Sequence, residues 1–398
     1  MPKAREFEIK AQPLRLFMPF VFEPLYVATI LCLLVALAEW LSRRRFFSYF
    51  GSALIVILAA AVLANVGLLP SSRNAPALYD GIFNYIAPLA IFFLLLDVKL
   101  RDLRQAGLPM LLMFSLGAAA TMVGVLVSYH VIAPQNHGVT QANAVAGMFT
   151  GTYIGGSVNL NAVALQYGVG KSGTLFAAIN AADNIITTIW IIATIILPRV
   201  LQKIWPRRVP VADSEMAAAL ELETSEETSV MDFSILLALG LGSLYLSQLL
   251  SRFLPALPYV LTLTTVALAL AQVPVVQRLG GAKVLGYFTV LIFLAVVGAY
   301  CDLAALIANG AVAGILLAWV TAIVFLHALL LFGIGALFKQ DWAIIAVASN
   351  ANIGGATSAG VLATAIGRGD LRLPGILAGS LGNALGTYAG FLIAELLR

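Results

Sequence analysis

The chain has 398 residues, of which 61% are hydrophobic and only 11% are charged, and its mean hydropathy is +0.96. A soluble domain carries about 25% charged residues, so this composition excludes a water-soluble globular protein, a disordered chain and a disulfide-stapled secreted fold. The net charge of +4 is typical of a membrane protein with basic cytoplasmic loops, and we expect no nucleic-acid partner. The lipid bilayer is therefore the expected environment of most of the chain.

Apolar runs in chain order predict twelve membrane-associated segments in two groups of six. An N-terminal tail, 1–23, precedes the first repeat, 24–198. A polar stretch, 199–230, which we interpret as a cytoplasmic linker, separates it from the second repeat, 231–398. The predicted segments are 24–41, 49–69, 81–98, 108–132, 141–168, 174–198, 231–251, 256–275, 283–301, 309–335, 341–366 and 374–397.

Two segments, 141–168 and 341–366, differ from the others because each is interrupted by Gly-Gly and carries several Asn, Ser and Thr residues. A lipid-facing helix does not tolerate so many polar groups. If all twelve segments cross, 10 Lys and Arg residues fall inside and 13 outside, contrary to the positive-inside rule. If these two segments enter and return on the same side, 15 of the 23 fall inside.

The sequence thus predicts an all-α polytopic membrane protein. Each half would have five transmembrane helices plus one re-entrant helical hairpin with a Gly-Gly tip. The alternative is a pair of broken crossing helices and 12 spans in all.

The two halves are also related by an internal repeat with an offset of 199 residues. Ile-Gly-Gly at 154–156 falls on Ile-Gly-Gly at 353–355, and Asn-x-x-x-Thr at 184–188 falls on the same pattern at 383–387. With five crossings in each half, the second half is inverted, which is a common plan of secondary transporters.

By this plan the chain divides into two functional parts. A core or transport part would comprise 108–198 and 309–398. A scaffold part would comprise 24–98 and 231–301.

The Gly-Gly tips are the first candidate binding site. Glycine lets the backbone turn sharply and approach a ligand closely, and the ends of two short helices offer free N–H and C=O groups to an anion or to Na⁺. The alternative is that small residues at these places only let helices pack tightly. The candidates are Thr152, Gly155, Gly156, Ser157, Asn159 and Asn161 at the first tip, and Asn350, Asn352, Gly354, Gly355, Thr357 and Ser358 at the second.

The helix after each tip is the second candidate site. Asp183 is the carboxylate well inside a span, and such an acid is by default a functional-site hypothesis, because burying it is costly unless it is paired or neutral. Asp183 could bind Na⁺ together with Asn184 and Asn383, or it could carry a proton. The alternative is a protonated side chain that holds helices together by hydrogen bonds. The candidates on these two helices are Asn180, Asp183, Asn184, Thr188, Asn383 and Thr387.

The remaining reactive residues give weak signals. His327 lies in mid-span and we expect it to be a packing residue, as we do for Cys32 and Cys301. No zinc-ligand spacing and no phosphate-binding loop is present. We therefore expect no catalytic residue and no cofactor, with Na⁺ or H⁺ as the coupling ion.

The stretches MFTGTYIGGSVNLNAVA, AADNIITTIW, SNANIGGATSAGVLA and GSLGNALGTYAGF resemble the YjcL-type family of uncharacterised bacterial membrane proteins, over nearly the whole chain. More distantly, the paired Gly-Gly tips are similar to those of the citrate/2-hydroxycarboxylate and sodium/glutamate symporters. That similarity implies an elevator mechanism and a homodimer. A substrate-binding arginine close to the second tip has no counterpart in this sequence, since Arg368 and Arg372 lie well past it. This difference argues against a di- or tricarboxylate substrate.

Together these patterns predict a secondary active transporter of a small polar or anionic organic solute, coupled to Na⁺ or H⁺, in the bacterial cytoplasmic membrane. The first alternative is a cation/proton antiporter that uses Asp183. The second is a membrane protein without transport activity, or a membrane-embedded enzyme.

Overall fold

The computed structural model describes residues 19–44, 47, 51–71, 74–207, 229–254, 258–304 and 310–398. Most of the predicted N-terminal tail and of the predicted linker lies outside these residues. The described residues form helices and contain no strand. The α-helices are α2 (Pro24–Ser42), α3 (Gly51–Asn65), α4 (Ala77–Gly81), α5 (Ala87–Leu95), α6 (Leu108–Ile132), α7 (Ala142–Gly155), α8 (Ser157–Gln166), α9 (Gly173–Ile204), α10 (Val230–Phe253), α11 (Tyr259–Leu270), α12 (Ala282–Ala299), α14 (Gly310–Leu337), α15 (Trp342–Ile353), α16 (Gly355–Ala365) and α17 (Arg372–Leu396).

Eight helices in the described part of the chain are long and apolar enough to cross a bilayer. One of them is the continuous helix Ala77–Leu95, which consists of α4, a π-helical turn and α5. The prediction of an all-α polytopic membrane protein is therefore confirmed. The other two predicted crossings, α3 with 15 residues and α11 with 12, rise only about 1.5 Å per residue and are shorter than a hydrocarbon core of about 30 Å. Five crossings in each half therefore remain a prediction.

The first glycine-interrupted segment folds as two antiparallel helices, α7 and α8. The chain turns at Gly156, where φ is +93°, a value that glycine adopts without strain. A Cβ atom added at Gly151 of α7 would lie 3.1 Å from the Cβ of Asn159 in α8. At the other end, the side-chain amide of Gln141 donates a 3.1 Å hydrogen bond to the carbonyl of Tyr167. Both ends of the segment thus lie together.

The second glycine-interrupted segment has the same shape. Helices α15 and α16 meet at Gly354, and Gly355 has a φ of +76°. Asp341 caps α15 by accepting a 2.9 Å hydrogen bond from the N–H of Ala343, and it forms an ion pair with Arg368, which follows α16. The ion pair joins the two ends of the segment, so this segment is also a helical hairpin.

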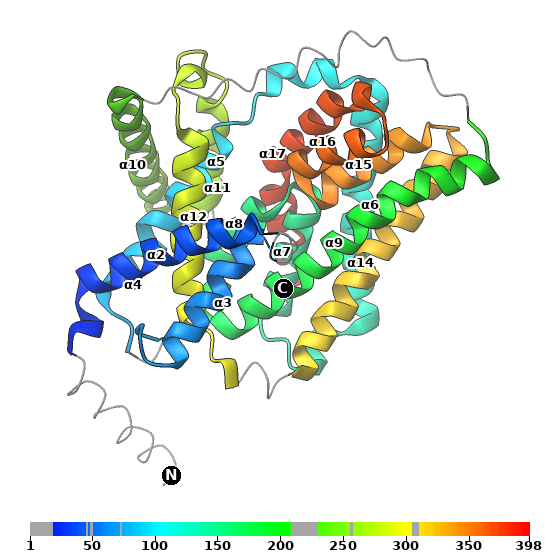
Figure 1. Cartoon of the computed structure of the whole chain (residues 1–398). Coiled ribbons are helices and arrows are strands. Elements are labelled where there is room, and N and C mark those ends of the chain that lie inside the picture. Colours follow the sequence, from blue (N-terminus) through cyan, green and yellow to red (C-terminus); the bar gives the residue numbers. More distant parts are fainter. Residues whose placement is uncertain are drawn as a thin grey trace.

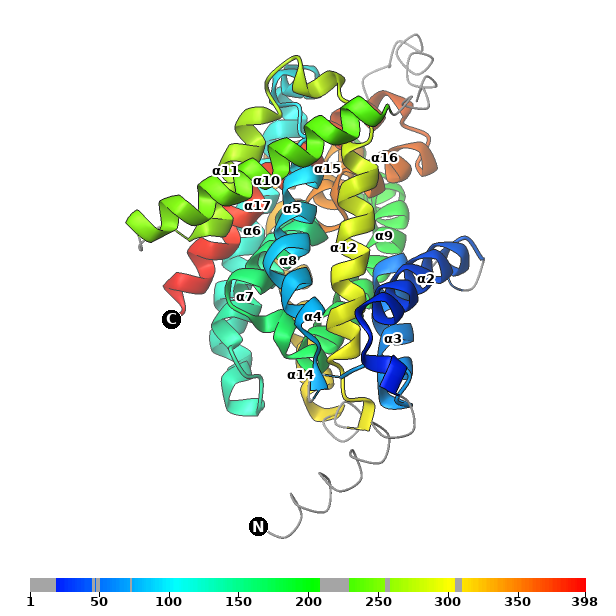
Figure 2. The ribbon, with the colours of Figure 1, turned by 90° about the vertical axis from the view of Figure 1, so that its left-hand side faces the viewer.

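The helices gather in two groups, which Figure 1 separates. Helices α2, α3, α5, α10, α11 and α12 lie on the left, and α6, α9 and α14–α16 lie on the right, with α7, α8 and α17 between them. In Figure 2 the group of α5, α10, α11 and α12 faces the viewer. The predicted division into a scaffold part and a core part stays a prediction.

Long helices such as α9 are polar toward the protein and apolar toward the outside. Ile185, Ile189, Ile192 and Ile196 have exposed fractions of 47–55%, whereas Thr194 on the opposite face is buried. This is the reverse of a soluble helix, because lipid rather than water surrounds the exposed face.

Candidate functional site

The tips of the two hairpins meet near the middle of the molecule. A Cβ atom added at Gly355 would lie 3.9 Å from the carbonyl oxygen of Gly155 and 4.0 Å from the Cα of Gly156. Helix α17 passes both tips, since Gly379 packs against Gly355 and Gly382 packs against Gly155. The predicted tip glycines therefore form one junction, although they are about two hundred residues apart in sequence.

Helices α7 and α17 approach so closely because glycine recurs at every fourth position on both. A Cβ atom added at Gly390 would lie 2.7 Å from the carbonyl oxygen of Gly147, and one added at Gly386 would lie 2.8 Å from that of Gly151. Small residues let membrane helices pack backbone to backbone. This close approach is what places α17 beside both tips.

A buried polar pair also joins the first hairpin to α17. The hydroxyl of Thr387 donates a 2.7 Å hydrogen bond to the side-chain oxygen of Asn159, and both residues are fully buried. The amide nitrogen of Asn159 has no partner among the described residues. Of the other predicted residues at this tip, Asn161 is buried, whereas Ser157 is exposed where α8 begins.

Asp183 is a buried carboxylate with no basic partner among the described residues. It interacts with the hydroxyls of Thr152 and Tyr153, and Tyr153 also interacts with Thr187. These groups lie close together, but the Oδ1 atom of Asp183 and the hydroxyl of Tyr153 form no hydrogen bond of ordinary length and angle with any described residue. Because an isolated charge is costly in a low-dielectric interior, this carboxylate needs a proton or a bound cation. The sequence analysis missed Tyr153, which lies in α7 and not in the helix of Asp183.

The other predicted residues of α9 face elsewhere. The side-chain amide of Asn180 bonds to the carbonyl of Phe176, that of Asn184 to the carbonyl of Asn180, and the hydroxyl of Thr188 to the carbonyl of Asn184. Asn184 and Thr188 line a mostly apolar cavity of about 670 Å³ between α3, α9 and α14. Asn383 lines a different cavity. The side chains of Asp183, Asn184 and Asn383 thus face three different surroundings.

The predicted polar residues of the second hairpin lie mainly in buried contacts. The amide of Asn350 donates to the Thr194 hydroxyl at 3.0 Å, and that of Asn352 donates to the Phe114 carbonyl at 3.1 Å. The side-chain oxygens of both asparagines have no partner among the described residues. Ser358 bonds back to the carbonyl of Gly355, next to Gly354.

His327 is buried, and both of its ring nitrogens have partners. Nδ1 lies 2.9 Å from the hydroxyl of Thr121, which donates to the carbonyl of Tyr153. Nε2 lies 2.9 Å from the hydroxyl of Ser349, which accepts from the indole N–H of Trp190. This pattern assigns the proton to Nδ1, so that Ser349 donates to Nε2. His327 thus links α6, α9, α14 and α15 through hydrogen bonds as well as packing.

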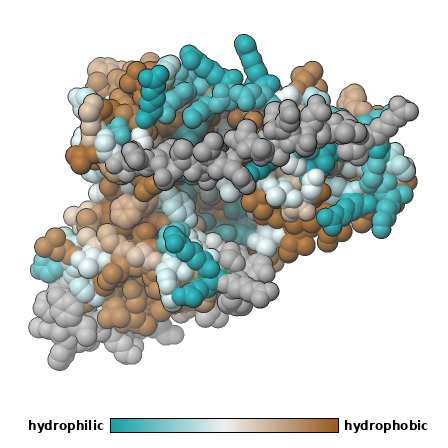
Figure 3. Space-filling model, turned by 45° about the horizontal axis from the view of Figure 1, so that its top comes forward, coloured by the Kyte–Doolittle hydropathy of each residue, from teal (hydrophilic) through white to brown (hydrophobic). Residues whose placement is uncertain are grey.

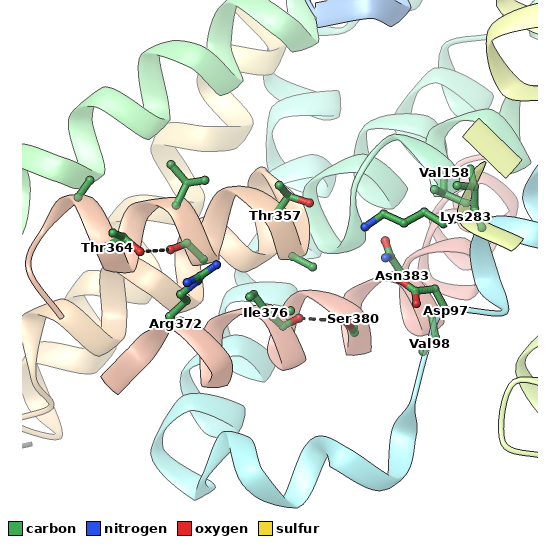
Figure 4. Close-up of a pocket in the computed structure, with 15 residues that line it drawn as sticks. Asp97, Val98, Val158, Lys283, Thr357, Thr364, Arg372, Ile376, Ser380 and Asn383 are labelled. Carbon is green, nitrogen blue, oxygen red and sulfur yellow. Dashed lines mark hydrogen bonds between the residues drawn. The ribbon is translucent and has the colours of Figure 1, made fainter. Parts of the chain in front are cut away.

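A cavity of about 860 Å³ reaches the junction of the tips. It lies between the end of α5 and the start of α12 on one side, and α16 and α17 on the other. Figure 3 shows the molecule hollowed between the two groups of helices, with white and teal side chains in the hollow. Figure 4 shows side chains that line the cavity, among them Asp97, Val158, Lys283, Thr357, Arg372 and Asn383.

Arg372 and Arg368 have different environments although both follow the second hairpin. Arg368 forms hydrogen bonds to Asp370 and Asp341 with a side-chain exposure of only 14%. The carboxylates of Asp370 and Asp341 raise the pKa of its guanidinium above the ordinary value. Arg368 is thus held at the base of the hairpin, whereas Arg372 lines the cavity. Arg372 therefore lines the same cavity as Thr357 and Asn383, although it lies well past the Gly-Gly tip in sequence.

At their opposite ends, α5 and α12 leave no such space. A Cβ atom added at Gly173, where α9 begins, would lie 2.6 Å from the backbone nitrogen of Cys301. The hydroxyl of Thr174 accepts a 3.1 Å hydrogen bond from the N–H of Asp302, and it also contacts the thiol of Cys301. The rings of Phe83 and Tyr300 stack nearby with centroids 5.6 Å apart. Helices α5 and α12 thus border a cavity at the end near Lys283. At the end near Cys301, α12 packs closely against the start of α9.

Comparison with known proteins gives the family. Residues 26–398 match the family described as "Protein of unknown function (DUF819)". The chain belongs to this family. A Bacillus subtilis (strain 168) protein described as "Uncharacterized membrane protein YjcL" is 27% identical over 370 residues, which cover 87% of this chain and 90% of that protein.

The predicted resemblance to YjcL-type proteins is therefore confirmed. With eight long apolar helices among its described residues, this DUF819 protein is an integral membrane protein. The more distant similarity to symporters stays a prediction.

Proposed function

We propose that this DUF819 protein is a secondary active transporter that moves a small polar or anionic organic solute by alternating access. One observation carries the proposal: the Lys283 end of α12 borders a cavity that reaches the hairpin tips, whereas the Cys301 end of the same helix packs tightly against the start of α9. A transporter must close one entrance to a central site while the other is open. The positive-inside rule favours a cytoplasmic position for Lys283 and Arg372, so in this proposal the conformation is open to the cytoplasm.

The sequence repeat supports a second, outward-open conformation. Two inverted halves give one structure two arrangements of similar energy. The two glycine-tipped hairpins enter from opposite sides in this proposal and would move with α6, α9, α14 and α17 against a scaffold of the other helices. We further propose that the protein is a homodimer in a bacterial cytoplasmic membrane and that its transport domain moves as an elevator. The proposed transport includes no catalytic step.

The coupling ion that we propose is Na⁺, bound by Asp183 together with the hydroxyls of Thr152 and Tyr153. The support is a buried carboxylate beside neutral oxygens, without a basic partner among the described residues. Hard cations prefer carboxylate, carbonyl and hydroxyl oxygens. Coupling to H⁺ at the same carboxylate is the alternative.

The closed contact can be tested with a reversible crosslink. In a Cys32→Ser background, Thr174→Cys places a thiol against the native thiol of Cys301. Oxidation should join α9 to the end of α12 and hold the outer entrance closed. Proteoliposomes with an imposed Na⁺ gradient would be incubated with a metabolite extract. We expect mass spectrometry to show solute accumulation in the reduced protein, its loss after oxidation and its recovery with a reductant.

The matched control is the same variant with Cys301→Ser, in which oxidation should change nothing. Two results would contradict the proposal. One is undiminished accumulation by the fully crosslinked protein. The other is failure of the two thiols to crosslink, which would mean that the outer contact is absent in the membrane.

A cation/proton antiporter is the second candidate function, because Asp183 is a buried acid without a basic partner among the described residues. This function predicts that Na⁺ added to acid-loaded vesicles dissipates the pH gradient when no organic solute is present. Asp183→Asn should abolish that exchange. Exchange without any solute would replace the symport proposal.

A further inference from the structure

We infer that the cavity binds a solute with a carboxylate or phosphate group, held between Lys283 and Arg372, an inference that rests on the proposed transport function. Lys283 is the second residue of α12, and Arg372 is the first residue of α17. The two cations therefore lie on different helices, one on each side of the cavity.

Figure 4 shows the side chain of Lys283 reaching into the cavity, with its ammonium group between Thr357 and Asn383. Arg372 lies on the other side, beyond Ile376. Neither cation forms an ion pair or a side-chain hydrogen bond with another described residue. This sets Arg372 apart from Arg368, whose guanidinium is fully engaged by two carboxylates. Asp97 is the one acid among the described residues that line the cavity, so the lining has a surplus of one positive charge.

The neutral polar groups of the cavity also favour a hydrogen-bond acceptor. The hydroxyls of Thr364 and Ser380 already donate to carbonyls of their own helices, at 3.1 Å each. Thr357 and Asn383 make no such bond with described residues and keep their donors available. The first turn of α16, which includes Thr357, lines the cavity and adds the positive end of a helix dipole.

The available donors thus come from an ammonium, a guanidinium, an amide and a hydroxyl. A carboxylate or phosphate offers several acceptor oxygens and a compensating charge to the exposed ammonium of Lys283 and the half-buried guanidinium of Arg372. A neutral or cationic solute offers no such charge. We therefore expect the cavity to bind an anionic solute more tightly than a neutral or cationic solute of similar size.

Probes that differ only in charge can test this selection. We would measure the thermal unfolding midpoint of the purified protein with succinate against succinamide, and with glycerol 3-phosphate against glycerol, at matched ionic strength. At least one acid should raise the midpoint in a saturable manner while its neutral counterpart does not. The first pair reports a carboxylate solute and the second a phosphate solute.

Variants then assign the effect to the two cations. K283Q and R372Q should each weaken binding of that acid by about tenfold to a hundredfold, since a hydrogen bond to a charged group is lost. K171Q, which removes an exposed positive charge that does not line the cavity, should bind as the native protein does. All three should keep the unliganded midpoint, which separates lost binding from misfolding.

Equal stabilisation by the acid and its amide or alcohol, unchanged binding in both cavity variants, or no shift from any acid would overturn the inference. The outcome is separable from that of the transport proposal. If a neutral solute is accumulated and the crosslink at Thr174 stops it, transport stands and this inference fails. If an acid binds through both cations but its movement ignores the crosslink, the inference stands and transport by alternating access fails.

Discussion

Replacement of Gly390 by alanine tests the backbone contact that frames the site. The added Cβ atom would lie 2.7 Å from the carbonyl oxygen of Gly147 and 2.8 Å from a methyl group of Val163. Ordinary van der Waals contact begins at 3.4 Å, so the carbonyl would have to retreat by 0.7 Å. Because that oxygen belongs to helix backbone and not to a flexible side chain, α7 and α17 must separate.

Overpacking of this kind costs about 1–3 kcal/mol. We therefore expect G390A to lower the unfolding free energy by about 1–3 kcal/mol. Thermal unfolding of the purified protein would measure this as a lower midpoint. The matched control is G333A in α14, where an added Cβ meets no atom within 4 Å. An equal midpoint for G390A and G333A would refute the close approach of the two helices.

Three further substitutions test individual side chains. Asp183→Asn should remove the dependence of solute uptake on Na⁺ and slow uptake at least tenfold while the protein still folds; normal ion-dependent uptake would reduce Asp183 to a structural residue. Thr387→Val leaves the buried side-chain oxygen of Asn159 without its donor, so unfolding should become easier by about 1–3 kcal/mol, measured as a lower thermal midpoint. Asp341→Asn removes one partner of Arg368 and should lower stability by about 2 kcal/mol, with faster proteolysis at the hairpin base; equal proteolysis would argue against that ion pair.

The sequence was sufficient to predict which segments are helical and which two are interrupted. Lipid demands long apolar runs, and a break at Gly155 or Gly354 is visible because glycine and asparagine are unusual there. The predicted segment 108–132 coincides with α6, and 24–41 differs from α2 by one residue at its end. Helix length was predicted less well, since α11 is much shorter than the apolar run 256–275 that contains it.

The composition of the candidate site could not be predicted in the same way. Lys283 served only as a topology marker at the start of an apolar run, and nothing local reveals that its side chain reaches into a cavity beside Asn383. Tyr153 reads as one more aromatic residue of α7, yet it lies beside Asp183 because two helices pack. Such groupings depend on tertiary contacts, which periodicity within one segment does not encode.

The pairing of α7 with α17 has a consequence for biosynthesis. The hydrogen bond between Asn159 and Thr387 spans 228 positions of sequence, and α17 follows every other described helix in the chain. The ribosome therefore synthesises the first hairpin long before α17, the helix against which the glycines of α7 pack. Until then, the polar groups of α7 and α8 lie in the membrane without their final partners. The first hairpin must reach its native position after synthesis of α17, so a chain truncated before α17 would lose the order of a hairpin more than two hundred residues upstream.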